Sequence, residues 1–129
     1  MQKTIEDFQS AEKRITTRFK VHYLTDIYLN DEIIYSTVID ISETGIGIVI
    51  PHRLYIDEEL KLRINCNLSS EPENCIKKIN IFLKARVLWV KEIDDKNMYR
   101  TGLEIIDISE DSLQKLQRHI QSLISRAFE

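Results

Sequence analysis

The sequence of 129 residues has the length of about one domain, and its 43% hydrophobic and 30% charged residues are typical of a globular protein. Its formal net charge of −3 argues against general binding of nucleic-acid polymers, which depends on many cations that neutralise phosphates. The longest apolar run, at residues 46–51, is far too short to cross a membrane, and residues 1–12 lack the apolar core of a secretory signal, so we expect a cytoplasmic protein without membrane insertion.

Residues 1–13 precede the first strand pattern and form a separate segment. Thr4 is followed three residues later by Asp7, as in a loose helix-capping box, and the apolar Ile5 and Phe8 lie around them. We expect this segment to be a short helix, or an arm that becomes ordered only on binding. The main domain is then expected to cover residues 14–129.

Alternation of apolar and polar residues predicts a series of strands after this segment. The clearest case is residues 60–68, in which apolar side chains face one way and polar side chains the other. The apolar face of a later strand is expected to run from Ile79 to Trp89, which makes Trp89 a packing residue. Residues 69–78 are predicted to be a polar loop. The expected strands are 19–29, 33–41, 46–50, 60–68, 79–90 and 98–106.

The pattern changes to helical spacing after the last strand. Apolar residues recur at steps of three and four from Leu113 to Ala127, with His119 off this stripe, and Ser109 or Asp107 is expected to cap the helix. Five or six short strands followed by one helix predict an antiparallel sheet too long to remain open. The fold class is therefore mainly β: a small closed or split antiparallel β-barrel, with the C-terminal α-helix covering one apolar opening.

One four-residue sequence, Asp-Ile-Ser-Glu, occurs twice in the chain. It is found at residues 40–43 and again at residues 107–110, where the helix is expected to begin. Only the first copy is followed by a glycine, Gly45, which we expect to provide the positive φ of a turn. The short distance from Gly45 to Gly47 indicates tight backbone geometry or the close approach of another group, although a plain β-turn is the alternative.

A basic segment stands out against the acidic background of the chain. Lys13, Arg14, Arg18 and Lys20 are four cations within eight residues, which alone is typical of a solvated arm. Arg14 and Arg18 also form the pattern R-x-x-x-R, and residues 40–45 form D-x-S-x-x-G downstream of it. In this order, the two motifs resemble those of the PilZ domain, the bacterial receptor module for cyclic di-GMP.

The resemblance extends over nearly the whole chain and implies a six-stranded barrel whose N-terminal segment wraps over the ligand. It implies that cyclic di-GMP binds to Arg14, Arg18, Asp40, Ser42 and Gly45. Arginine can form paired hydrogen bonds with phosphate oxygens or with a guanine edge, and it can stack on the base. Asp40 can accept hydrogen bonds from guanine N–H groups, and Ser42 can donate or accept.

No catalytic constellation, cofactor or metal site is expected. His22, His52 and His119 are scattered, and Cys66 and Cys75 have no histidine pair at ligand spacing. We therefore expect a binding module and not an enzyme: a cyclic di-GMP receptor that changes its surface to regulate an unidentified partner protein. The output would be a process such as motility, pilus function or exopolysaccharide synthesis, and we expect no separate output domain.

Three alternatives remain open at this point. The first keeps the fold without the ligand, as a PilZ-like adaptor that binds only proteins. The second is a small barrel that binds single-stranded nucleic acid, which the negative charge and the small number of aromatic residues disfavour. The third is a split-barrel flavin enzyme.

Overall fold

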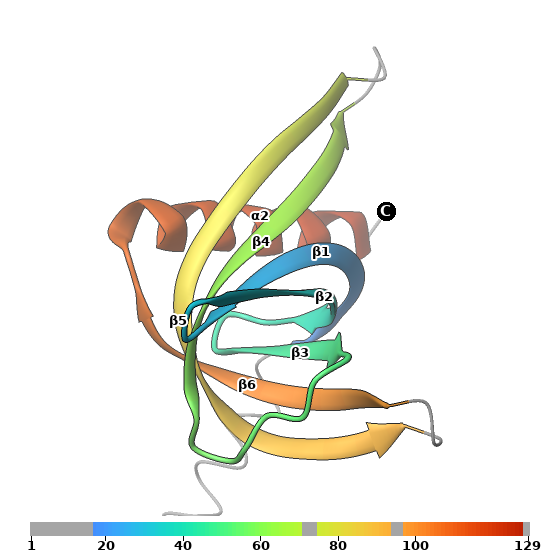
Figure 1. Cartoon of the computed structure of the whole chain (residues 1–129). Coiled ribbons are helices and arrows are strands. Elements are labelled where there is room, and N and C mark those ends of the chain that lie inside the picture. The colour runs from blue at the N-terminus through green and yellow to red at the C-terminus, as the bar shows by residue number, and fades with distance from the viewer. Residues whose placement is uncertain (1–16, 71–74, 94–96, 128–129) are drawn as a thin grey trace, which may run out of the picture.

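The computed structural model describes residues 17–70, 75–93 and 97–127 (Figure 1). Within these residues it contains six strands and one helix, in the order expected from the sequence. No helix in this part of the chain is both long and apolar enough to cross a membrane. The elements are β1 (Phe19–Leu29), β2 (Glu32–Ile41), β3 (Gly45–Ile50), β4 (Glu59–Ser70), β5 (Cys75–Ile93), β6 (Met98–Ile108) and α2 (Glu110–Ala127).

The strands form a closed antiparallel barrel in the order β1–β2–β3–β6–β5–β4, with β4 pairing back to β1. Strands that are consecutive in sequence are also neighbours in the barrel, except that the connection from β3 leads to β4 on the opposite wall (Figure 1). The predicted mainly β barrel with a C-terminal helix is confirmed. Because every strand is hydrogen-bonded to both of its neighbours, the outer faces of the strands are fixed relative to one another.

Alternate side chains of the strands point into the barrel and form its hydrophobic core. Leu116 and Ile120 of α2 are buried against this core, so the helix covers one opening as predicted. The expectation that His119 lies off the apolar face is wrong, because its side chain is 1% exposed. His119 is three residues after Leu116, and this helical spacing places both on the same face.

The segment between β4 and β5 differs from the prediction of a polar loop over residues 69–78. The ladder between the two strands continues to the pair Ser70↔Cys75, so only residues 71–74 separate them. The far ends of these strands extend beyond the barrel beside α2 (Figure 1). Serine favours turns locally, but at Ser69 and Ser70 pairing with the neighbouring strand decides the conformation.

The outer end of β5 also differs from the prediction, which placed Trp89 on the core-facing side. The register between β5 and β6 shifts between Val87 and Trp89, which is the signature of a β-bulge. As a result, Leu88 and Trp89 are both exposed, at 45% and 43%, although Val87 is buried. Trp89 therefore packs on the outside of the barrel and not in its core.

Candidate functional site

A row of cross-strand partners runs around the outside of the barrel over five strands. Lys20 on β1 pairs with Asp40 on β2, and Asp40 pairs with Gly47 on β3. Gly47 pairs with Gly102 on β6, which in turn pairs with Trp89 on β5. Two adjacent members of this row, Gly47 and Gly102, have no side chains, because both are glycines.

The neighbouring side chains fold over these two glycines. A Cβ atom at Gly47 would overlap the carboxylate of Asp40, and a Cβ atom at Gly102 would overlap the indole ring of Trp89. Any larger residue at either position would have to displace the side chain that lies on it. The prediction of close approach to the backbone near Gly47 is thus confirmed, and the approaching group is Asp40.

Two arginines hold the carboxylate of Asp40 on the outer surface. Nη1 of Arg18 is 2.6 Å from Oδ1 of Asp40, and Nη2 of Arg100 on β6 is 3.9 Å from Oδ2. The side chains of Arg18 and Arg100 are 50% and 51% exposed, whereas that of Asp40 is 18% exposed. The structure therefore brings together one arginine of R-x-x-x-R and the aspartate of D-x-S-x-x-G. Arg14 lies outside the described residues.

Ser42 organises the turn between β2 and β3. Its hydroxyl accepts hydrogen bonds from the backbone N–H groups of Thr44 and Gly45, at 3.3 and 3.1 Å, and lies 3.2 Å from the carbonyl oxygen of Gly45. The side chain is 1% exposed, so its polar atom is already satisfied within the protein. Ser42 therefore fixes the backbone conformation of the turn that follows Asp40.

Gly45 is required for a different reason from the one predicted. No described glycine has a positive φ, so the expectation that Gly45 adopts the left-handed region is wrong. A Cβ atom at this position would lie 2.9 Å from the carbonyl oxygen of Leu103 and 3.0 Å from Nη2 of Arg18. Glycine therefore lets β3 lie close to β6 and leaves room for the guanidinium of Arg18.

Arg100, Gly102 and Trp89 contribute to this surface but were not among the residues predicted for the site. They come from β6, which the barrel places next to β3, and from β5, which pairs with the other side of β6. A glycine inside a strand pattern, such as Gly102, is the one sequence signal that points to close packing at this place.

The second Asp-Ile-Ser-Glu copy serves the helix. Oγ of Ser109 accepts a hydrogen bond from the backbone N–H of Ser112 at 3.2 Å, and α2 begins at the next residue, Glu110. Ser109 is therefore the N-cap, and the alternative of a cap by Asp107 is wrong. Oγ of Ser112 also accepts a hydrogen bond from the backbone N–H of Phe82 at 3.0 Å, which ties the start of α2 to β5.

A partly buried polar pair lies between the barrel and α2. The hydroxyl of Tyr23 is 2.6 Å from Nε2 of His119, and the two rings meet edge to face. Burial lowers the pKa of His119, assisted by the positive charge of Arg126, and burial raises the pKa of Tyr23 to about 12. The imidazole of His119 is buried, whereas Tyr23 is only partly buried. Among the described residues no group of three or more His, Cys, Asp or Glu side chains could hold a metal ion.

Comparison with solved structures places the chain among proteins of one fold. The MotI/DgrA inhibitor of motility from Bacillus subtilis matches with a TM-score of 0.66 and 22% identity, over 85% of this chain and 51% of that one. This chain therefore spans about half the length of the Bacillus subtilis protein. The PilZ domain of YcgR from Escherichia coli, solved with c-di-GMP, matches with a TM-score of 0.64 and 19% identity, over 87% and 92% of the two chains.

A more distant match is the PlzA protein of Borreliella burgdorferi, solved in complex with c-di-GMP. Its TM-score is 0.53 at 11% identity, over 97% of this chain and 57% of that one. No curated protein matches the sequence significantly. The family model described as PilZ domain matches residues 12–122, which is most of the sequence. The chain therefore belongs to the PilZ domain family.

Proposed function

We propose that this protein is a receptor for cyclic di-GMP and that the ligand binds on the outer surface around Asp40. The observation that carries the proposal is the ion pair between Arg18 and Asp40, 22 residues apart in sequence and 2.6 Å apart in space, beside a floor of glycine backbone. The PilZ domain of YcgR and the PlzA protein, which share this fold, were both solved with c-di-GMP. The assignment of a cytoplasmic binding module without enzymatic activity belongs to the same proposal.

The chemistry of this surface fits a cyclic dinucleotide. The ligand carries two phosphodiester charges and two guanines, and exposed arginines can bind either group with paired hydrogen bonds. Arg18 and Arg100 present such guanidinium groups on either side of Asp40. Asp40 can accept hydrogen bonds from the N–H groups of a guanine edge. Arg14 would add a further guanidinium from the segment that precedes β1.

Binding would exchange partners within the site. Without ligand, Arg18 and Asp40 satisfy each other, and Ser42 and Gly45 hold the turn that supports them. With ligand, the carboxylate turns to guanine and the guanidinium turns to phosphate or base. The segment that carries Arg18 would therefore change its position on the barrel, and this altered surface would be read by a partner protein.

The same ion pair supports one alternative, a PilZ-like adaptor that does not bind cyclic di-GMP. Because Arg18 and Asp40 are already paired, the surface is complete without a ligand. Isothermal titration calorimetry with cyclic di-GMP separates the two functions, with GMP as the control. We expect a dissociation constant of about 0.1 to 10 μM. Folded protein that shows no heat of binding at about 100-fold higher ligand concentration would exclude the receptor and leave the adaptor.

A further inference from the structure

A second concave surface is formed by β1, β4, β5 and the end of β6, and it reaches Ser109 just before α2. This groove has a volume of about 310 Å³, which is near the lower end of the range for pockets that bind small ligands. Leu62 and Leu83 border it but are only 1% and 5% exposed, because their side chains belong to the barrel core, so its apolar surface comes mainly from Phe82, whose side chain is 49% exposed. The hydrogen bond from the backbone of Phe82 to Ser112 fixes this wall to the helix.

Two lysines lie side by side on neighbouring strands at the groove. Lys61 on β4 pairs in register with Lys84 on β5, and like charges in such a pair repel each other. Nζ of Lys84 is 3.1 Å from Oε1 of Glu59, whose other oxygen lies 3.4 Å from Nη2 of Arg86. In the part of the chain that the structure describes, Lys61 has no ion-pair partner. The groove therefore has one positive charge on the β4 side that a carboxylate from outside would neutralise.

The apolar surface continues from the groove onto β2. Tyr28, which lines the groove, pairs across the strands with Ile33, and the neighbouring Asp26 pairs with Tyr35. Ile33 and Tyr35 are 51% and 72% exposed. Large apolar side chains that gather on an exposed face often mark a protein interaction site. Aromatic residues bordered by charged side chains are also typical of such sites.

A partner segment can be recognised at the groove only through its side chains. Over the groove, β4 is hydrogen-bonded to β1 on one side and to β5 on the other, as the pairs Tyr28↔Lys61 and Lys61↔Lys84 show. A partner cannot add a strand at this place, because no backbone edge is free there. An apolar side chain of the partner can lie against the aromatic rings of Tyr28 and Phe82, and a neighbouring carboxylate can reach Lys61.

We propose that this groove binds a segment of a partner protein that carries a large apolar side chain next to an acidic residue. The apolar side chain would lie against Phe82 and Tyr28, and the carboxylate would bind Lys61. Asp107 lies on the β6 side of the groove and disfavours a second acidic residue there, so the charge sets the direction of the segment.

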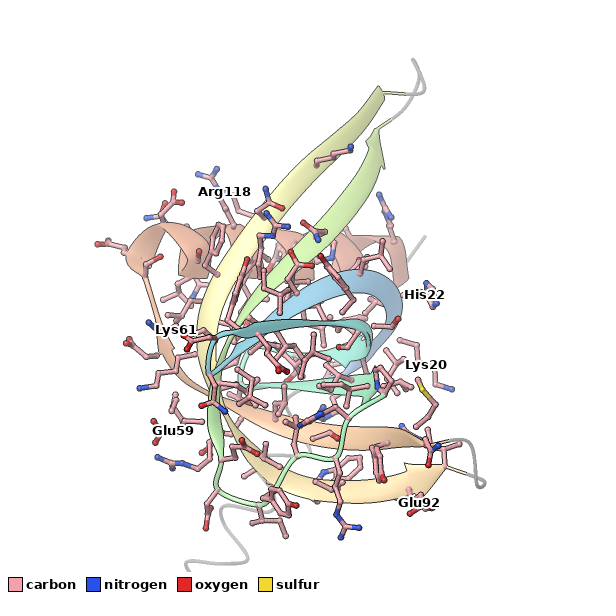
Figure 2. All side chains as sticks on the ribbon, viewed as in Figure 1. Lys20, His22, Glu59, Lys61, Glu92 and Arg118 are labelled. Atoms are coloured by element: carbon pink, nitrogen blue, oxygen red, sulfur yellow. The ribbon has the colours of Figure 1, made fainter. Side chains whose placement is uncertain are left out.

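The groove is centred on β4, whereas the proposed cyclic di-GMP site is centred on Asp40 and Gly47 of β2 and β3. In the closed strand order, β4 is three strands from β3 in either direction. Figure 2 shows Lys61 and Glu59 projecting on one side of the barrel and Lys20, the cross-strand partner of Asp40, projecting on the other. The groove can therefore bind its partner without competing with the nucleotide, and this inference does not depend on the proposed function.

The test uses the full chain labelled with ¹⁵N and a capped synthetic peptide with two aspartates followed by Leu-Phe and two glycines. We expect the peptide to shift the amide resonances of Lys61, Phe82 and Lys84, with a dissociation constant below about 1 mM. Two matched peptides serve as controls: one has lysines in place of the aspartates, and the other has Ala-Ala in place of Leu-Phe. Both should bind at least about tenfold more weakly.

The Lys61→Glu variant tests the charge directly. It should fold well, because it replaces a like-charge pair with an opposite-charge pair, and it should bind the acidic peptide at least about tenfold more weakly. Arg118→Glu makes the same charge change at an exposed position of α2 that does not line the groove, and should bind like wild type. The proposal is overturned if the acidic and basic peptides bind equally, or if Lys61→Glu binds the acidic peptide as wild type does. Concentration-dependent shifts of these amides without peptide would assign the surface to a second copy of the chain instead.

Discussion

Asp40 and Gly47 are cross-strand partners on β2 and β3, and the carboxylate of Asp40 occupies the space that a side chain at position 47 would need. The arrangement fixes an acidic group on the outside of the barrel, where Arg18 and Arg100 approach it from two directions. A glycine within a strand weakens the strand, because it gains nothing from packing and loses more conformational entropy on folding. Here the glycine leaves the space that the carboxylate of Asp40 occupies.

This relationship predicts that Gly47→Ala destabilises the protein only while Asp40 is present. The added methyl group must displace the carboxylate, and we expect a loss of about 1–3 kcal/mol in the free energy of unfolding. In an Asp40→Ala background, the same substitution should cost less than about 0.5 kcal/mol, because nothing remains to be displaced. Urea denaturation of the four proteins of this cycle measures the coupling. Equal losses in both backgrounds would show that the two residues act independently.

The arginine motif predicts a selective loss of ligand affinity. Arg14→Ala and Arg18→Ala should each weaken cyclic di-GMP binding by roughly 10- to 150-fold, because hydrogen bonds to charged groups are lost. The effect of Arg18→Ala on stability should stay below about 1 kcal/mol, since its ion pair with Asp40 is exposed to solvent. Lys20→Ala is the matched control from the same segment and should cost much less affinity. Equal losses in all three variants would indicate a diffuse basic patch.

The single tryptophan of the chain provides an optical signal for the site. Trp89 is 43% exposed and packs on Gly102, which is the cross-strand partner of Gly47. A nucleotide bound over the glycine floor should change the environment of the indole, so we expect its fluorescence emission to change in proportion to occupancy. GMP at the same absorbance controls for light absorption by guanine. Calorimetric binding without any change in emission would place the nucleotide away from this surface.

Most of the barrel could be predicted from the sequence, because side chains alternate between the core and solvent and each strand carries this period on its own. The prediction failed where pairing overrides local preference. Residues 69–70 continue β4, although serine favours a turn, because β5 is available as a partner. Trp89 lies outside the core because a β-bulge changes the phase of β5, and no residue near Val87 marks a bulge in the sequence.

The candidate site could be predicted only in part, for the same physical reason. Arg18 and Asp40 belong to recognisable motifs, and the structure places them together. The positions of Arg100 and Trp89 depend on β6 pairing with β3 and on the register of β5, which are contacts between distant parts of the chain. The sequence placed His119 off the apolar face of α2 because histidine is polar. In the structure it lies on the buried face, where the hydroxyl of Tyr23 forms a hydrogen bond with Nε2.

The buried His119 predicts a loss of stability in mild acid. Burial lowers the pKa of His119 in the folded protein, below the ordinary value of 6.5 that it regains on unfolding. As the pH falls below about 6.5, the unfolded chain binds a proton that the folded chain does not, so folding becomes less stable until the folded pKa is passed. Thermal melts between pH 8 and pH 5 should show a smaller decline for His119→Gln than for wild type. His22→Gln, at an exposed position on β1, should decline as wild type does.

The two Asp-Ile-Ser-Glu copies should respond to mutation in opposite ways. Asp40→Ala removes the proposed guanine acceptor, so it should reduce the rise in melting temperature that cyclic di-GMP causes, with little change in the melting temperature without ligand. Ser109→Ala removes the N-cap of α2, so it should cost about 0.5–2 kcal/mol of stability and leave the ligand-induced rise near that of wild type. Asp107→Ala controls for the motif itself and should change neither quantity, because Asp107 does not cap the helix. Thermal melts with and without ligand measure both effects in one experiment. A full ligand-induced rise in Asp40→Ala, together with none in Ser109→Ala, would show that the nucleotide binds at the second copy.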